Sequence, residues 1–244
     1  MRQRRLKDLD EKLTELEDYL DSDGRENKGA WRRLFANKAI NASWEITRML
    51  YEGVVTEEDI EASFEEPDTR LCLEIGCGKG KFLCDRAADF PDDLFIGVEG
   101  QESVIVRAAE KVRDTNHWNI HLLSGYIHDV HEFFDDGEVD VIYLNFSDPW
   151  PKAKHAKRRL THRDYLASYM DILSDRGYIE FKTDNDDLFE FTVEEAEAMG
   201  YTISEITRDL AASDYESAGY RTEYEEKFIE QGIKIKYLKI EKCE

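Results

Sequence analysis

Asp148 stands between an apolar segment and a basic one, among residue types that can act on a base within a nucleic acid. The apolar segment, residues 139–146, has the length and the branched and aromatic content of a buried strand. Two prolines, one on each side of Trp150, follow Asp148 and restrict the backbone that presents its carboxylate and the indole ring. Residues 152–163 then hold six Lys or Arg, two His and no Asp or Glu. A carboxylate beside an aromatic ring and phosphate-binding cations indicates chemistry on a base, although a strand ending in a solvated basic turn has the same outline.

A second group of candidate ligand-binding residues lies between a predicted strand and a predicted helix. It consists of Glu74, Gly76 and Gly78. Glycine at these positions lets the backbone turn sharply and approach a ligand closely. Glu99 ends the next predicted strand, where an acidic side chain can accept both ribose hydroxyls of an adenosine. Such a site serves nicotinamide dinucleotides and S-adenosylmethionine alike. The glycine spacing is G-x-G-x-G, and the carboxylate before the first glycine suits a sulfonium and an amino group better than a pyrophosphate.

A sheet must position these residues, because predicted strands alternate with predicted helices from Arg70 onward. The expected strands are residues 71–75, 94–99, 120–125, 139–146, 177–183, 201–210 and 227–240, and the expected helices are 79–90, 102–113, 130–134, 160–173 and 187–199. This alternation predicts an α/β fold with a doubly wound, mostly parallel, seven-stranded sheet of the Rossmann-like kind. Ligands bind outside the carboxyl ends of such strands, so the glycine segment, Glu99 and Asp148 are expected to converge. Asp184 would lie on the same rim, with a helix cap as its alternative role.

Residues 1–68 are expected to form a helical, acidic appendage before a main domain over residues 69–244. Leucines at positions 6, 9, 13, 16 and 20 alternate in steps of three and four, which predicts a helix over residues 2–20 that packs on its own domain. A second helix is expected over residues 31–50. A third, acidic helix is expected over residues 57–68 and would end at Pro67.

The formal net charge of −22 argues against non-specific nucleic-acid binding, since phosphate would be repelled. A nucleic acid would have to bind at the basic segment, with salt-sensitive affinity. No apolar run approaches the ~18 residues of a membrane span, and the basic N-terminus lacks the apolar core of a signal peptide. The four cysteines form no C-x-x-C pair, so no metal site is expected, and reduced thiols in the cytoplasm are the simpler account.

Several segments resemble the signature blocks of the bacterial tRNA (guanine-N7)-methyltransferases. They are EIGCGKGKF at 74–82, NFSDPWPK at 145–152, KHAKRRLT at 154–161, FKTDN at 181–185 and TEYEEKF at 222–228. The resemblance implies a class I methyltransferase fold, S-adenosylmethionine as the methyl donor with S-adenosylhomocysteine as the product, and tRNA as the partner. The implied reaction forms 7-methylguanosine at the guanine of the variable loop, position 46 in tRNA numbering.

The resemblance also implies roles for individual residues. Asp148 is the implied active-site residue, and cofactor contacts are implied for Glu74, Gly76, Gly78, Glu99, Tyr126 and Asp148. Substrate contacts are implied for Lys152, Asp184, Thr222, Glu223, Tyr224 and Glu225, and RNA contacts for Lys154, His155, Lys157, Arg158 and Arg159. Tyr126 departs from the family, which usually carries an acidic or amide residue near the adenine. A tyrosine there would stack on the adenine or donate its hydroxyl. Residues 38–69 look like an insertion, and by composition alone residues 222–225 read as a loop before a strand.

Three other functions stay open at this point. Ser147 to Trp150 is similar to the Asp/Asn-Pro-Pro-aromatic motif of amino-group methyltransferases, but a tryptophan replaces the second proline. An RNA-binding protein could keep this fold without activity, although the residues expected to hold the cofactor are all present. A nicotinamide-dependent dehydrogenase fits the glycine spacing less well. Monomer and homodimer are equally compatible with the sequence.

Overall fold

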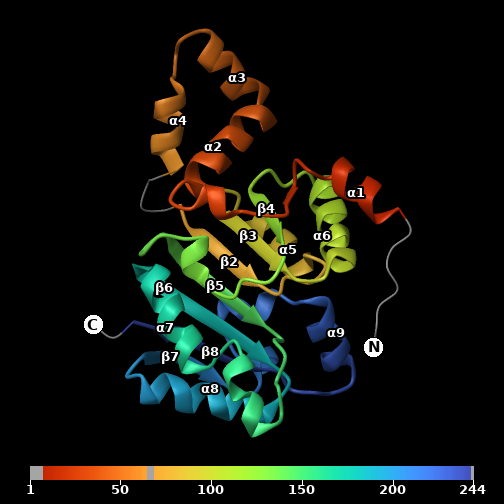
Figure 1. Ribbon diagram of the computed structural model, residues 1–244, viewed down its shortest axis with the longest axis vertical. Coiled ribbons are helices and arrows are strands. Elements are labelled where there is room, and N and C mark those ends of the chain that lie inside the picture. The colour runs from red at the N-terminus through yellow and green to blue at the C-terminus, as the bar shows by residue number, and fades with distance from the viewer. Residues whose placement is uncertain (1–7, 65–68, 243–244) are drawn as a thin grey trace.

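A mixed sheet of eight strands runs through the part of the chain that the computed structural model describes, residues 8–64 and 69–242 (Figure 1). The strands are β1 (Leu20–Asp21), β2 (Leu71–Ile75), β3 (Leu94–Glu99), β4 (Ile120–Ser124), β5 (Val139–Asn145), β6 (Leu173–Thr183), β7 (Thr202–Thr207) and β8 (Lys236–Glu241). Their order in the sheet is β1-β4-β3-β2-β5-β6-β8-β7. Neighbours from β1 to β6 are parallel, and β8 is antiparallel to both β6 and β7. The doubly wound, mostly parallel fold is therefore confirmed.

Strand β1 was not predicted, so the sheet has eight strands among the described residues instead of the expected seven. The helix expected over residues 2–20 is described as α1 (Leu9–Glu15) only, and the beginning of that prediction lies outside the described residues. Leu16 and Leu20 are both buried, but residues 16–19 form a turn, in which the Tyr19 amide donates to the Leu16 carbonyl at 2.9 Å, and Leu20 then pairs with Leu122 of β4. The leucine pattern thus continues from a helix into a strand at the edge of the sheet.

Three helices, α2 (Trp31–Ala42), α3 (Trp44–Tyr51) and α4 (Glu57–Phe64), project from the body at the top of Figure 1. The single helix predicted over residues 31–50 is wrong, because Ser43 divides it. The Ser43 backbone is extended, and its hydroxyl accepts a hydrogen bond from the Ile46 amide at 3.3 Å, which starts α3 anew. The buried rings of Trp31 and Phe35 lie in the main core and join α2 to the sheet.

Each face of the sheet has its own hydrophobic core. Leu71 and Leu73 of β2 point to a core shared with α7 (Arg163–Ile172), α8 (Asp186–Ala198) and the start of α2. Cys72, between them, points to the other core, which holds α1, α5 (Lys81–Asp89) and α6 (Glu102–Thr115). Strands β2 and β5 are buried along their whole length, as expected for central parallel strands covered on both faces.

The segment after residue 220 forms a helix where a loop and a strand were expected. α9 (Glu223–Glu230) begins after Thr222, whose hydroxyl accepts a hydrogen bond from the Glu225 amide at 3.0 Å. Thr-x-x-Glu is a capping motif that starts helices, and residues 223–230 are helical although the apolar residues that follow the motif had suggested a strand. β8 begins only at Lys236. No helix among the described residues is both long and apolar enough to cross a membrane.

Candidate active site

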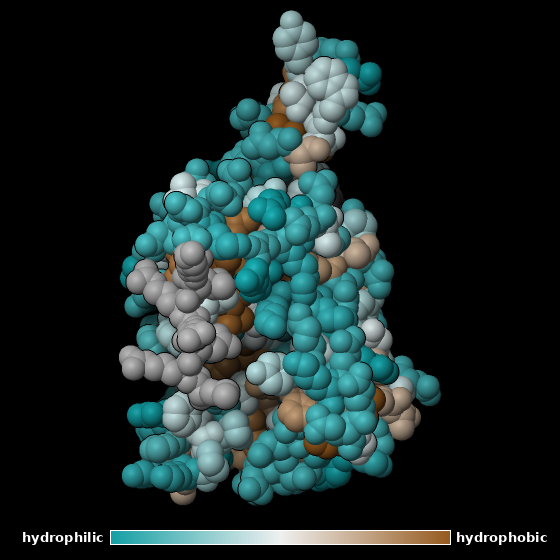
Figure 2. Space-filling model, turned by 90° about the vertical axis from the view of Figure 1, so that its right-hand side faces the viewer, coloured by the Kyte–Doolittle hydropathy of each residue, from teal (hydrophilic) through white to brown (hydrophobic). Residues whose placement is uncertain are grey.

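The site lies where the strand order reverses, between β2 and β5. The chain leaves β2 toward β3 and β4 on one side and returns to β5 on the other, and in such a sheet the ligand crevice is expected at the carboxyl ends of these strands. These ends, the arrowheads of Figure 1, point toward the side that Figure 2 shows, and brown hydrophobic atoms are visible in a hollow in the middle of that face.

A carboxylate and an amide meet across this crevice. Glu74 of β2 is buried, and its Oε1 accepts a hydrogen bond from the Asn145 side chain of β5 at 2.8 Å. Three buried atoms nearby have no hydrogen-bond partner in the described part of the chain: Glu74 Oε2, Asn145 Oδ1 and Ser147 Oγ. Buried polar atoms are normally paired, so this cluster fits a polar ligand with hydrogen-bond donors.

Burial is the main cause that raises the pKa of Glu74 to about 8, with smaller contributions from the carboxylates of Glu223 and Glu99. The hydrogen bond from Asn145 and the ammonium of Lys182 act in the opposite direction. A positively charged ligand at Oε2 would favour the ionised form of Glu74. The carboxyl group is thus suited to a cation such as a sulfonium or an ammonium.

The glycine segment after β2 presents an open backbone surface. Gly76 and Gly78 have φ angles of +87° and +56°, and a Cβ atom on either would meet nothing within 4 Å. Glu99 faces this segment, because its Oε2 accepts a hydrogen bond from the Gly78 amide at 3.2 Å and its Oε1 one from the Gln101 amide at 2.9 Å. Each oxygen keeps a further lone pair for a ribose hydroxyl.

A cavity of about 290 Å³ adjoins the ends of β3 and β4, and Tyr126 lines it. Val98 and residues 123–128 form one part of its wall, and residues 22–25 of the N-terminal segment form another. Tyr126 is 68% exposed, and its ring lies against Gly100, where a Cβ atom would approach the ring to 2.2 Å. The ring also lies nearly parallel to that of His128, with 6.3 Å between their centres, so it is an exposed aromatic surface at the cavity wall.

Asp148 lies at the tip of a strained turn after β5. Phe146 and Trp150 on either side of it have φ angles of +54° and +39°, a region that bulky residues rarely adopt. The Asp148 carboxylate is exposed and makes no hydrogen bond or ion pair with any residue of the described chain. Strained backbone that the surrounding fold maintains is common at active sites.

The basic segment separates into outward and inward side chains. Lys152, Lys154 and Lys157 are exposed, and Lys157 pairs with Asp164 at 3.5 Å. Arg158 and His155 both contact the ring of Trp150, Arg158 over its face at 4.9 Å and His155 edge-on at 5.7 Å. Arg159, in contrast, is buried.

Asp184 follows β6 on the same rim. The cap of α8 is Asn185, whose side chain accepts a hydrogen bond from the Leu188 amide at 2.8 Å, so Asp184 does not have the capping role considered for it. Its carboxylate is half-buried and has no hydrogen-bond or ion-pair partner among residues 8–64 and 69–242.

The four residues 222–225 are brought beside the glycine segment, but their side chains differ in availability. Thr222 caps α9, and Glu225 is buried beside Lys182, with 3.5 Å between its Oε2 and the lysine Nζ. Glu223 pairs with Lys111 of α6 at 2.8 Å, and Tyr224 is 65% exposed. Of these four residues Tyr224 is the most accessible to a substrate, although Lys227 lies over its ring at 5.7 Å.

Sequence reasoning missed Asn145 and Lys182. Lys182 is buried, and its Nζ donates to the carbonyl oxygens of Ser217 at 2.8 Å and Tyr220 at 2.6 Å, which fixes the segment before α9. For Asn145 a polar residue at the end of an apolar run was the available signal, whereas Lys182 stands in a strand that also carries Glu180 and Thr183 and gave none.

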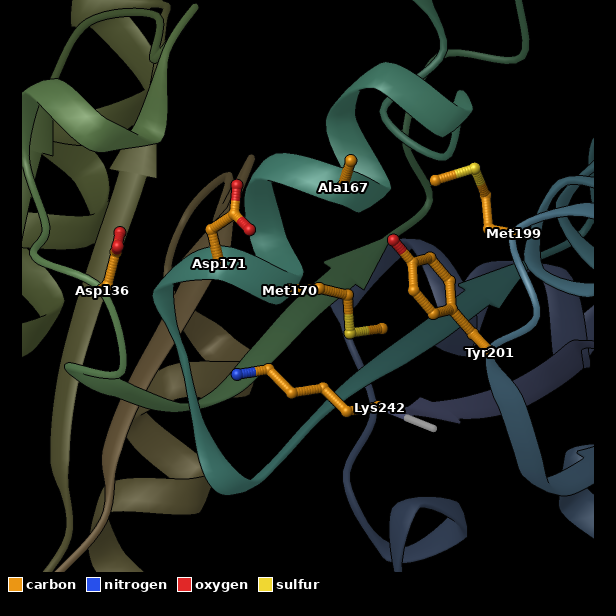
Figure 3. Close-up of a pocket in the computed structure, with 7 residues that line it drawn as sticks. All are labelled: Asp136, Ala167, Met170, Asp171, Met199, Tyr201 and Lys242. Atoms are coloured by element: carbon orange, nitrogen blue, oxygen red, sulfur yellow. The ribbon is translucent and has the colours of Figure 1, made fainter. Parts of the chain in front are cut away.

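A larger cavity, of about 470 Å³, lies at the opposite edge of the sheet. Asp136 and Asp171, which line it, precede the starts of β5 and β6, and the side chains of Met170 and Tyr201 point toward one another in Figure 3. None of the predicted site residues lines this cavity. Within the described chain, no three His, Cys, Asp or Glu side chains are grouped to hold a metal ion.

The fold and the site together define a class I methyltransferase. A solved 16S rRNA methyltransferase, KamB, superposes with a TM-score of 0.55, although it is only 11% identical, and the match covers 77% of this chain and 94% of that one. The family model Methyltransf_4, described as "Putative methyltransferase", matches residues 68–238.

Curated relatives identify the family within this class. The tRNA (guanine-N(7)-)-methyltransferase of Streptococcus agalactiae serotype III (strain NEM316) is 38% identical over 232 residues, covering 95% of each chain. That of Halalkalibacterium halodurans is 44% identical over 165 residues, which cover 68% of this chain and 74% of the relative. The chain belongs to the tRNA (guanine-N(7)-)-methyltransferase family.

Proposed function

We propose that this chain acts in the cytoplasm and transfers the methyl group of S-adenosylmethionine to N7 of guanine 46 in the variable loop of tRNA. The observation that carries the proposal is the placement of the Asp148 turn. It follows β5 at the crevice that Glu74 and Asn145 line, and the exposed lysines of the basic segment continue from it. Methylation of tRNA guanine at N7 follows from the family, and the position 46 target is the finer part of the proposal.

The residues at the crevice fit the parts of S-adenosylmethionine. Bound there, the cofactor supplies a methyl group that its sulfonium has already activated. Glu74 and Asn145 would hold its cationic amino-acid end through their unpaired oxygens, and Glu99 would accept from its ribose hydroxyls. Tyr126 would lie beside its adenine.

Asp148 would act on the guanine. N7 carries an in-plane lone pair and needs no base to remove a proton, so correct placement of the guanine is the main requirement. Attack on the methyl carbon leaves positive charge on the guanine ring, and the fixed carboxylate of Asp148 would stabilise that charge. The same carboxylate can accept hydrogen bonds from the guanine edge.

Removing the charges of Lys152, Lys154 and Lys157 together should weaken tRNA binding and flatten its salt dependence. Each lysine that neutralises one phosphate contributes about 0.7–0.9 to the slope of log affinity against log salt concentration. The slope of the triple alanine variant should therefore be smaller in magnitude by about 2–3. Filter binding to tRNA at several salt concentrations measures this slope. A slope equal to that of the parent protein would refute phosphate binding by these lysines.

Tyr126→Ala should raise the dissociation constant for S-adenosylmethionine several-fold, up to about tenfold, because aromatic stacking contributes about 0.5–1.5 kcal/mol. Tyr126→Phe should bind nearly as well as the parent, since the ring remains. Titration calorimetry of both variants separates stacking from hydrogen bonding. If Phe weakens binding as much as Ala does, the hydroxyl makes the contact.

Methyl transfer from labelled S-adenosylmethionine to unmodified tRNA transcripts tests the proposed function. We expect 7-methylguanosine by mass spectrometry, and no product when guanine 46 of the transcript is replaced by adenine. An exocyclic N-methylated nucleoside would instead support an amino-group methyltransferase. Binding of tRNA and cofactor without any methylation would support a binding protein.

A further inference from the structure

Arg159 differs from the other cations of the basic segment because its side chain is turned into the fold. It is 9% exposed, and its guanidinium lies 4.3 Å from the centre of the Phe191 ring of α8. The neighbouring Lys157, by comparison, has a side chain that is 81% exposed. A guanidinium enclosed in this way is much less accessible to a phosphate than the exposed ammonium of Lys157.

The two carbonyl groups to which the Arg159 guanidinium donates belong to the Asp148 turn. Its Nε donates a hydrogen bond to the Pro149 carbonyl at 3.0 Å, and its Nη2 donates one to the Trp150 carbonyl at 3.2 Å. These are the two peptide carbonyls that follow Asp148. A planar guanidinium can donate to two acceptors at once in a fixed geometry, which the single ammonium of a lysine cannot reproduce.

The turn has a conformation that needs such support. Trp150 has a φ angle of +39°, which a bulky side chain adopts only when its surroundings impose it. Arg158 and His155 contact the ring of Trp150, whereas Arg159 holds its backbone. The direction of the Asp148 carboxylate therefore depends on Arg159.

We propose that Arg159 is a positioning residue that holds the Asp148 turn in its reactive conformation and does not bind tRNA phosphate. This inference rests on the proposed function, because it assigns Arg159 a part in the same methyl transfer. It separates Arg159 from Lys154 and Lys157, with which it shares a sequence block. Its effect should appear in the rate of the chemical step and not in the affinity for tRNA.

Arg159→Met and Lys157→Met form the matched pair that tests this role. Arg159→Met should lower kcat for methyl transfer about 100-fold, the loss expected for a misplaced reacting group, while KM for tRNA and the salt slope of tRNA binding stay as in the parent. Lys157→Met should raise KM for tRNA and reduce the salt slope by about 0.7–0.9. Arg159→Lys should recover part of kcat, because one of the two carbonyl hydrogen bonds can form.

A salt slope in Arg159→Met that falls as it does in Lys157→Met, with kcat retained, would overturn the proposal. If Arg159→Met does not fold, Phe191→Leu offers a second variant, which leaves the arginine but removes the ring beneath it; it should lower kcat with an unchanged salt slope. Hydrogen exchange over residues 146–151 needs no activity. Faster exchange there in Arg159→Lys supports the positioning role even if the parent proves inactive on tRNA, and unchanged exchange refutes it.

Discussion

Asp148→Ala is expected to lower kcat for methyl transfer by about 100-fold or more, with the fold intact. Removing a preorganised group that stabilises charge in a transition state costs about 10²–10³ in rate. The fold should survive because the Asp148 carboxylate is exposed and has no partner in residues 8–64 and 69–242. Single-turnover transfer to tRNA measures the rate, and thermal unfolding measures the stability.

Two further variants make this result specific. Asp148→Asn keeps the size of the side chain and one acceptor oxygen but removes the charge, so it should be nearly as inactive as the alanine variant if charge stabilisation is the role. Asp187→Ala removes another exposed carboxylate, from the first turn of α8, and should leave turnover within about twofold. Near-normal activity in Asp148→Ala would exclude Asp148 from the reaction.

The fold could be predicted wherever burial imposes a periodic pattern. Strands β2 to β5 lie within a residue or two of their predicted bounds, because each is buried between two layers of helices. Hydrophobic patterns do not predict the elements whose bounds depend on a few local contacts. β1 has only two residues, too few to show a hydrophobic period. The first turns of α3 and α9 depend on the hydroxyls of Ser43 and Thr222, which cap them.

The candidate site was predictable in its position but not in the contacts of each side chain. Glu74 and Glu99 lie in the last two residues of their strands and Asp148 follows β5, and a parallel sheet places such ends along one rim. Whether a side chain faces a substrate or the interior depends on residues distant in the sequence. Glu225 turns toward Lys182, and Arg159 packs on Phe191, and neither contact leaves a local signal in composition.

The binding of S-adenosylmethionine should tighten as pH rises toward 8, and Glu74→Gln should abolish this dependence. Burial first of all raises the pKa of Glu74 to about 8, so in the free protein this carboxyl group keeps its proton at neutral pH. A cation beside Oε2 favours the carboxylate, and the dissociation constant should therefore increase by up to about tenfold for each pH unit below that pKa. Titration calorimetry between pH 6 and pH 8 measures the effect.

Glu74→Gln keeps the shape of the side chain and the pairing with Asn145 but cannot ionise. We expect its affinity for the cofactor to be about 100-fold weaker than that of the parent at pH 8, with a smaller difference at pH 6. The exposed Glu102→Gln, at the first residue of α6, is the matched control and should keep the parental pH profile. A parental pH profile in Glu74→Gln would assign the titration to the amino group of the cofactor.

The stability of the protein without cofactor should show the opposite trend. Because the pKa of Glu74 is higher in the folded chain than the ordinary value of 4.5, the folded state binds more protons than the unfolded state between those two values. The stability contributed by the protonated group is complete below pH 4.5 and is lost as pH rises through about 8. As pH rises from 4.5 to about 8, the melting temperature of the parent should therefore fall relative to that of Glu74→Gln. With saturating cofactor, the melting temperatures of the two proteins should change with pH in the same way. Parallel curves for the two proteins without cofactor would show that Glu74 is already ionised at neutral pH.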